Sequence, residues 1–238
     1  MDLFLAAVFL MQDKTAEETF KHMEDLVRGA KSVCVRFKVV VTEDAKIQLT
    51  GSGALLLKEG NKLNYSITSL EAGIHDKEYH FISDGSQIRG SYHRVDRGAV
   101  RELQQATPVD LLGNFIAGVC KAGVGGLLTY DAVTAFLGVS GANPKTVPLR
   151  WKEMLTVSGL RQGEADTESA NAIHYKLHLS ADTSAPAAEM KVWIDPKTNM
   201  PVKRIFSFGN FTATETYEEF TLNGDIADEK FMIPKERK

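Results

Sequence analysis

The sequence has few cysteines and no excess of basic residues, which argues against disulfide frameworks, zinc sites and nucleic-acid interfaces. Cys34 and Cys120 are the only two cysteines in 238 residues, and their separation does not match the paired spacing of a zinc site. We expect two buried thiols that pack as small apolar side chains. A disulfide between them is the alternative if the chain is exported. The net charge of -3 offers no basic surface for nucleic acid.

The sequence also lacks an apolar run long enough to cross a bilayer. The apolar stretch from Leu3 to Met11 has the length of a signal-peptide core. Asp2 stands where a basic residue is typical, and an N-terminal helix packed on the domain is the alternative. We interpret residues 1–12 as a signal segment, which makes the protein periplasmic or otherwise exported. Residues 13–238 are then expected to form one domain.

Catalytic and metal-binding motifs are missing as well. Gly51-Ser52-Gly53 does not have the G-x-S-x-G pattern of a nucleophile elbow. Gly123 to Gly126 lacks the lysine of a phosphate-binding loop. His174 and His178 share a strand face, where surface positions are expected, and a metal site would need converging ligands. The sequence therefore predicts no enzyme, no metal and no cofactor.

One helix and many strands are present. Thr15 to Ala30 is expected to be a helix, because Thr15 and Glu18 form a capping-box pattern ahead of an apolar stripe. After it, alternation of apolar and polar residues predicts strands. The expected strands are 33–41, 48–58, 61–69, 78–83, 87–92, 151–158, 173–180, 191–194, 202–208 and 211–222. Phe231 and Ile233 are expected to anchor the chain after the last strand.

Between the two groups of strands lies an insert, 97–148, which we expect to be helical. It contains two apolar stretches without alternation, 108–118 and 131–137, separated by glycine-rich sequence. The order of helix, meander, insert and meander predicts the α+β class. We expect a single strongly curved antiparallel sheet, or half-open β-barrel, covered by the N-terminal helix and the insert.

A curved sheet under a thin helical lid leaves room for an apolar ligand, and such a site suits acyl chains. The predicted lining residues are apolar positions of the strands: Val35, Phe37, Leu55, Leu57, Leu63, Tyr65, Phe81, Trp193, Phe206 and Phe208. The predicted lid residues come from the insert: Leu111, Leu112, Phe115, Ile116, Leu127, Leu128 and Phe136. The alternative is that these residues only fill a core.

Several segments resemble the periplasmic lipoprotein-carrier family (LolA/LolB-like). These are RFKVVV, GSGALLLKEGNKLNYSI, FISDGSQI, KVWIDPKTNMPVKRI and TYEEFTLNGDIADEKFMIP, in that order. The resemblance covers roughly residues 15–92 and 150–234 and implies a half-open barrel that holds acyl chains beneath helices. The family's lid-latching arginine is missing, because the corresponding stretch is Lys58-Glu59-Gly60-Asn61.

These observations lead to two hypotheses. In the first, the protein is a monomeric carrier or sensor that binds a lipid, or the acyl chains of a lipoprotein. In the second, the same fold has a filled core and docks a membrane-bound protein partner. The first expects an apolar cavity and a movable lid, and the second expects an exposed apolar patch.

Overall fold

The computed structural model describes residues 15–71, 74–94, 98–109, 111–124, 154–164, 171–178 and 186–234. Within these residues, two α-helices, α1 (Ala16–Arg28) and α2 (Leu111–Lys121), accompany eleven strands. The strands are β1 (Ser32–Glu43), β2 (Lys46–Lys58), β3 (Lys62–Glu71), β4 (Ile74–Asp84), β5 (Gln87–Arg94), β6 (Gly98–Ala106), β7 (Thr156–Gln162), β8 (Asn171–His178), β9 (Ala188–Ile194), β10 (Pro201–Phe208) and β11 (Phe211–Leu222). A short 3-10 helix, η2 (Asp228–Phe231), follows them.

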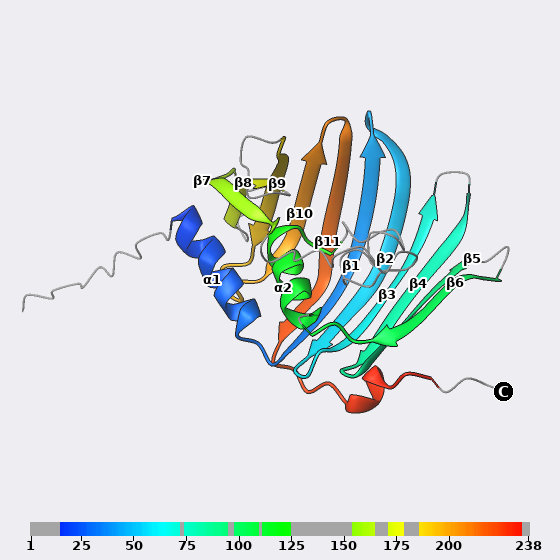
Figure 1. Cartoon of the computed structure of the whole chain (residues 1–238). Helices are drawn as coiled ribbons and strands as arrows, with labels where there is room; N and C mark the ends of the chain where they lie inside the picture. Colours follow the sequence, from blue (N-terminus) through cyan, green and yellow to red (C-terminus); the bar gives the residue numbers. More distant parts are fainter. Residues whose placement is uncertain are drawn as a thin grey trace, which may run out of the picture.

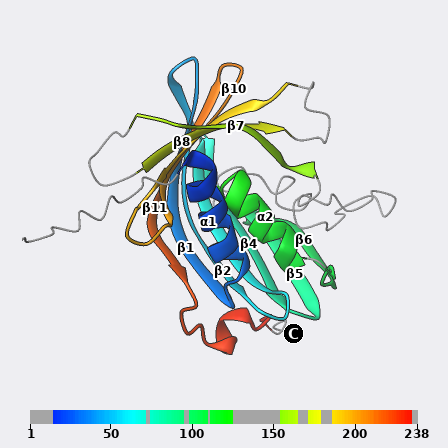
Figure 2. The ribbon, with the colours of Figure 1, turned by 90° about the vertical axis from the view of Figure 1, so that its left-hand side faces the viewer.

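The strands form one open sheet, as expected from the two meanders. Its order is β6-β5-β4-β3-β2-β1-β11-β10-β9-β8-β7, and the neighbouring strands pair antiparallel. The first and last strands of the chain therefore meet in the middle of the sheet. Figure 1 shows the sheet curving around both helices, and Figure 2 shows α1 and α2 side by side against its concave face.

Helix α1 forms as the sequence predicts. The Thr15 hydroxyl accepts a hydrogen bond from the Glu18 amide, and the Glu18 carboxylate accepts one from the Thr15 amide, which completes the capping box. Phe20, Met23 and Val27 are buried along one stripe of the helix. Because α1 buries this stripe against the sheet, its charged residues stay on the solvent side.

The concave face carries two apolar clusters. The larger lies on β1 to β5 and includes α2, while the second joins α1 to β8, β9 and β10. The alternation of each strand sorts its side chains. On β1, for example, Val33, Val35, Phe37 and Val39 are buried whereas Arg36 and Lys38 are exposed. The curved sheet with helices on its inner face is the α+β arrangement that the sequence predicts.

The chain after β11 crosses the convex face of β2 to β5. The Lys58 ammonium donates to the Ile226 carbonyl over 2.6 Å, and the Asn64 amide donates to the Lys230 carbonyl over 2.6 Å. The Phe231 side chain is buried, whereas Ile233 is half-buried. Phe231 is thus the anchor that the sequence predicts, and we call residues 223–234 the C-terminal strap.

Three sequence predictions need correction or completion here. Residues 98–106, expected within a helical insert, form the edge strand β6, whose backbone pairs with β5. The strand expected at 151–158 is β7, which begins at Thr156 and continues to Gln162. Both cysteines are free thiols, with Cys34 half-buried beside Glu219 and Cys120 buried in α2. The disulfide alternative is therefore wrong.

Some predictions fall outside the described residues. They include the signal segment 1–12 and the expected helix at 131–137. Within the part of the chain that the structure describes, no helix has the length and hydropathy needed to cross a membrane.

Candidate ligand-binding site

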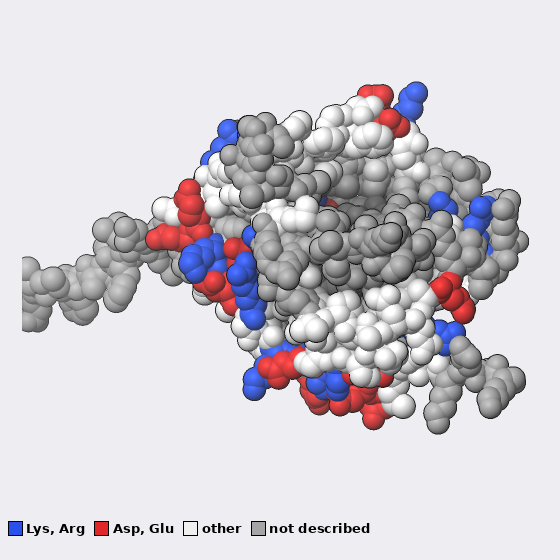
Figure 3. Space-filling view, in the orientation of Figure 1, with Lys and Arg blue, Asp and Glu red and all other residues white. Residues whose placement is uncertain are grey.

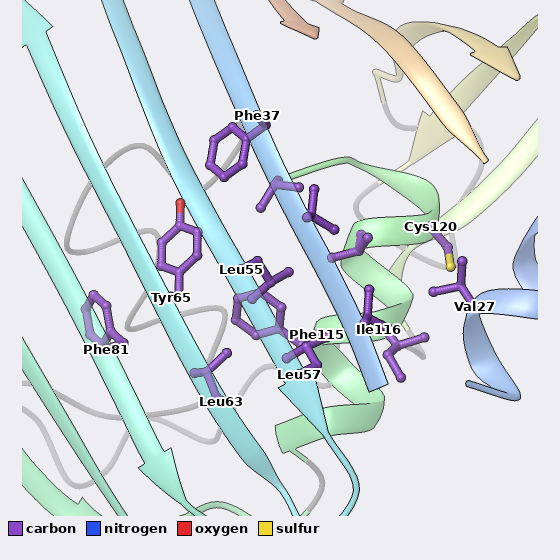
Figure 4. Close-up of a cluster of buried hydrophobic side chains, with 14 of the residues drawn as sticks. Val27, Phe37, Leu55, Leu57, Leu63, Tyr65, Phe81, Phe115, Ile116 and Cys120 are labelled. Atoms are coloured by element: carbon purple, nitrogen blue, oxygen red, sulfur yellow. The ribbon is translucent and has the colours of Figure 1, made fainter. Parts of the chain in front are cut away.

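Seven of the predicted lining residues lie together on the concave face. They are Val35, Phe37, Leu55, Leu57, Leu63, Tyr65 and Phe81, and each is at most 1% exposed. The strand registers place them in rows that run across the sheet. One row joins Val35, Leu55, Tyr65 and Phe81, so that apolar side chains of four neighbouring strands lie next to one another on the concave face. Figure 4 shows Leu55, Leu57 and Leu63 of the strands close to Phe115 and Ile116 of α2, with Phe37, Tyr65 and Phe81 extending the apolar surface to one side.

Two glycines allow aromatic rings to lie flat on this floor. A Cβ atom at Gly53 would come within 2.8 Å of the Phe37 ring, and one at Gly90 within 2.5 Å of the Phe81 ring. Because these positions have no side chain, each ring covers the neighbouring strand instead of standing away from it. The Phe37 and Tyr65 rings are nearly parallel, with centroids 6.4 Å apart. The result is a broad aromatic floor.

Helix α2 covers the floor with the predicted lid residues. Leu111, Phe115 and Ile116 are buried in the same cluster, and Leu112 is half-buried against it. The Phe115 ring lies 6.0 Å from the Tyr65 ring, centroid to centroid. The four described lid residues thus belong to the same apolar cluster as the seven lining residues of the concave face.

Polar side chains of the sheet hold α2 at its first turn. The Leu112 amide donates to the Asn61 side-chain oxygen over 3.3 Å, and the Asn61 amide group donates to the Val109 carbonyl over 3.0 Å. Asn61 adopts a positive φ of 58° in the turn between β2 and β3, a conformation that asparagine accepts more readily than most residues. It therefore performs the role of a helix cap from outside the helix.

An arginine holds the other end of α2. The Arg204 guanidinium donates to the Val119 carbonyl over 2.8 Å and to the Cys120 carbonyl over 3.0 Å. These are carbonyls of the last helical turn, which have no partner within the helix. The Tyr175 hydroxyl donates to the neighbouring Lys121 carbonyl over 2.7 Å. A buried cation at the carbonyl end of a helix is also favoured by the helix dipole.

Glu215 faces Arg204 across β10 and β11 and completes this buried group. Its carboxylate accepts a hydrogen bond from the Val124 amide over 3.1 Å and a short one from the Tyr217 hydroxyl. A Cβ atom at Gly123 would lie 2.6 Å from the carboxylate oxygens and 2.8 Å from the Arg204 guanidinium, so the backbone there approaches both charges.

Burial and charge shift the pKa values of this group. Burial raises the pKa of Tyr217 well above its usual range, while Arg204 lowers it in part. Burial also raises the pKa of Tyr175, to about 12. Burial lowers the pKa of Arg204, but Tyr217, Tyr175 and Glu215 more than offset this. The tyrosines therefore stay protonated and the arginine stays charged at neutral pH.

Three predicted lining residues lie elsewhere. Trp193 packs with Ala172 and Ile205, and it alternates with Val192 and Ile194 of the second apolar cluster. It therefore lies on the convex face, where Lys191 and Lys203 approach its ring within 4.3 and 4.5 Å of the centroid. The prediction that Trp193 lines the concave face is wrong by one step of alternation.

The two remaining phenylalanines diverge along β10. Phe206 is half-buried against the second cluster and not against the larger cluster that contains the lid residues of α2. Phe208 is 49% exposed next to Phe211 at the tip of the hairpin, so it is not a lining residue. The lid residues Leu127, Leu128 and Phe136 lie outside the described residues.

The residues that tie down α2 were not identified from the sequence. Arg204 lies two residues before Phe206 on β10, so both side chains are on the same face of the sheet. The signal available in the sequence was therefore a charged residue on an apolar face. No group of three or more histidine, cysteine, aspartate or glutamate side chains among the described residues could hold a metal ion.

Comparisons with known proteins concern the fold. Neither a protein-family model nor a curated protein matches the sequence. The solved structures similar to this one include LppX, a lipoprotein of Mycobacterium tuberculosis, with a TM-score of 0.46 and 13% identity over 89% of this chain and 97% of that chain. A LolA superfamily protein of Nitrosomonas europaea has a TM-score of 0.34 and 12% identity, over 92% and 98% of the two chains.

A third similar structure is the MucA/MucB complex of Pseudomonas aeruginosa. Its TM-score is 0.38 and its identity 9%, over 92% of this chain and 61% of that chain. These similar structures support a LolA-like fold, which is the fold of the family that the sequence resembles. Each of these TM-scores is below 0.5, and the likeness concerns the fold alone.

Proposed function

We propose that the protein is an exported, non-catalytic carrier or sensor of a lipid or lipoprotein acyl chain. The ligand binds between α2 and the aromatic floor of β1 to β4. The observation that carries this proposal is the way α2 is attached. Among the described residues, Leu111, Phe115, Ile116 and Val119 of α2 pack into the cluster of the floor through apolar side chains, and the hydrogen bonds that join α2 to the sheet lie at its two ends. Apolar contacts are not directional, so an acyl chain can replace them.

Uptake then exchanges one apolar contact for another. Leu111, Phe115 and Ile116 withdraw from the floor, and the acyl chain takes their place against Leu55, Tyr65 and Phe81. The area removed from water stays similar, which keeps the free-energy cost of opening small compared with unfolding. The ends of α2 supply the directional bonds that bring the helix back after release.

The test is a cavity variant with a matched control. Phe115→Ala removes a ring between α2 and the floor, and such changes leave space that an apolar ligand can fill. Phe20→Ala removes an equally buried ring from α1, where it packs edge-on to Tyr175. We expect both variants to lose about 3–5 kcal/mol of stability. Only Phe115→Ala should change the affinity for a fluorescent fatty acid, by tenfold or more.

Variants that no longer fold would be replaced by Phe115→Leu and Phe20→Leu, which remove less volume. Equal effects of the two substitutions on lipid affinity, or no uptake by the wild-type protein, would refute the proposed site. Native mass spectrometry of the protein purified from its own envelope fraction provides an independent check. It should detect a lipid mass that solvent extraction removes.

The second candidate function is a protein-interaction module, and one observation favours it. The side chains of the concave cluster are buried, and apolar side chains are exposed instead at the hairpin tips. Phe208 and Phe211 are 49% and 45% exposed at one tip, and Ile47 is 58% exposed at the neighbouring one. Under this alternative, Phe208→Ser abolishes binding to a membrane-bound partner and leaves lipid uptake unchanged.

A further inference from the structure

Exposed apolar side chains gather at one end of the sheet. Among the described residues, nine large apolar side chains are exposed, and four of them lie at the ends of two hairpins: Val40, Ile47, Phe208 and Phe211. One hairpin consists of β1 and β2, the other of β10 and β11, and β1 pairs with β11. Figure 2 shows both hairpin ends projecting together, at the end of the sheet away from the C-terminal strap. Single exposed apolar residues are common, but a group of them marks a contact surface.

Hydrogen bonds join the two hairpin ends into one unit. The Asp44 amide donates to the Asn210 carbonyl over 3.2 Å, and the Asn210 side-chain amide donates to the Glu43 and Asp44 carboxylates over 3.2 and 3.4 Å. Asp44, Ala45 and Gly209 have positive φ values, as tight turns require. Because polar groups of the two turns bind one another, the hairpin ends can enter less polar surroundings at a smaller cost in free energy.

The exposed apolar side chains lie on both faces of the sheet. Phe208 and Phe211 lie opposite each other on the concave face, two residues beyond Phe206 along β10. Val40 lies on the convex face, because both of its neighbours in β1 pack against the concave cluster. Ile47 is on the convex face as well, since the residue opposite it lies two places beyond Val40. A partner that rests on one face leaves the other in water, whereas a medium into which the hairpin ends dip covers both.

The charge at these hairpin ends is of mixed sign. Lys46 lies opposite Glu43, and Asp44 is exposed beside them. Figure 3 shows acidic and basic atoms next to each other at the upper end of the view, beside uncharged surface. Neither sign forms a patch that would attract a strongly charged partner, so burial of the apolar side chains is the main driving force. The surface of a bilayer with zwitterionic headgroups fits this pattern, because it surrounds apolar side chains with acyl chains and offers both charges to the turns.

We propose that the ends of these two hairpins insert into the surface of a lipid bilayer with zwitterionic headgroups. This inference rests on the proposed function, because the bilayer is then the source or the destination of the acyl lipid. Apolar side chains connect the two places. Val41 and Leu49 lie opposite each other next to the hairpin ends, and both pack against the cluster of the floor. The lipid moves along them between the bilayer and the floor without crossing open water.

The experiment measures flotation of the protein with vesicles of dioleoyl phosphatidylcholine. Phe208→Ser combined with Phe211→Ser should lower the partition coefficient at least tenfold, since two phenyl rings no longer enter the bilayer. Val109→Ser is the control and should leave it unchanged. Val109 is 94% exposed, but it lies beside Asn61 at the opposite end of β2. In a second assay, transfer of a fluorescent fatty acid from the wild-type protein should accelerate with vesicle concentration. The double variant should transfer about tenfold more slowly and bind the fatty acid with unchanged affinity.

Unchanged partition of the double variant, or no binding of the wild-type protein to the vesicles, would overturn the bilayer contact, while fatty-acid binding would still support the proposed function. Failure of the wild-type protein to bind the fatty acid would overturn the proposed function and with it the path along Val41 and Leu49. Binding that needs anionic lipid and disappears at high salt would show electrostatic attachment and also overturn the proposal.

The vesicles contain no protein, so binding to them separates this proposal from the second candidate function. Self-association in sedimentation that the double variant abolishes, without vesicle binding, would assign the hairpin ends to a second copy of the chain and overturn the proposal. The melting temperature verifies the fold of each variant. A double variant that does not fold would be replaced by Val40→Thr with Ile47→Thr, for which the same loss of vesicle binding is expected.

Discussion

The two helices on the concave face cover the sheet in different ways. α1 has one buried stripe and a charged outer side, where Lys21 pairs with Asp25 and Arg28 with Glu24. α2 has eight of its eleven residues buried and ion pairs of this kind are not seen along it in the described part of the chain. α1 therefore has the sequence of an ordinary surface helix, whereas α2 resembles a segment of the core.

Their intrinsic stabilities differ as well. α1 has a capping box and two acidic residues in its first turn, which stabilise a helix locally. α2 includes Gly113 and Gly118 within its eleven residues and has no acidic residue in its first turn, and each interior glycine costs about 1 kcal/mol relative to alanine. α2 is helical mainly because the sheet holds it. Under the proposed function, this difference makes α2, and not α1, the cover that a ligand would displace.

The largest test of this comparison concerns the arginine at the end of α2. Arg204→Met should cost about 3–5 kcal/mol of unfolding free energy, because it removes a buried cation that binds the last carbonyls of α2 and faces the buried Glu215. Arg204→Met combined with Glu215→Leu should recover most of the loss, since apolar side chains can replace two buried charged residues that face each other. Urea unfolding at neutral pH measures both.

The control is Lys203→Met, the neighbouring residue on the convex face. Its ammonium lies 4.5 Å from the Trp193 ring centroid, and a contact of this kind contributes about 0.5–1 kcal/mol. If Arg204→Met cost no more than Lys203→Met, the buried group would not be what holds α2.

A smaller test compares the first turns of the two helices. Asn61→Gly removes the side chain that caps α2 and keeps the positive φ accessible. Thr15→Ala removes the cap of α1, and each change should cost about 1 kcal/mol. Amide hydrogen exchange should separate them. Asn61→Gly accelerates exchange in α2 alone, because this helix opens locally, whereas Thr15→Ala leaves α2 unchanged.

Exchange that rises equally throughout the sheet in Asn61→Gly would mean that α2 opens only when the whole domain unfolds. In that case the contrast between the helices would disappear. The filled-core alternative for the function would then be preferred.

Sequence patterns predicted the parts of this fold that depend on local chemistry. The capping box placed α1 within two residues of its observed start and end, and alternation placed the meanders because one face of each strand is buried. β6 was missed because an edge strand pairs on one side only and can be polar along its whole length. Its sequence, GAVRELQQA, has little alternation to detect.

The site was less predictable, since it depends on contacts between distant residues. Trp193 was assigned to the wrong face because both faces of β9 are buried, with Val192, Trp193 and Ile194 each at most 2% exposed. Alternation is informative only where one face meets water. Arg204 and Asn61 hold α2 through hydrogen bonds to helix residues that are 85 and 51 positions away in the sequence. No local sequence pattern indicates such contacts.

The smallest predicted effect is a local loss of stability at low pH, and it affects only the half of the sheet beneath α2. Asp228 accepts hydrogen bonds from Lys58 and Lys62 over 2.7 and 2.9 Å, which lower its pKa to about 2. A carboxyl whose pKa is lower in the folded state stabilises that state at pH values above its unfolded pKa, near 4. This contribution is lost as the pH falls from about 4 to about 2.

We therefore expect the C-terminal strap to loosen in that interval, with faster amide exchange in β2 and β3 and little change in β8 and β9. Asp228→Asn should remove the pH dependence of this difference, and its persistence in that variant would mean that another carboxylate attaches the strap.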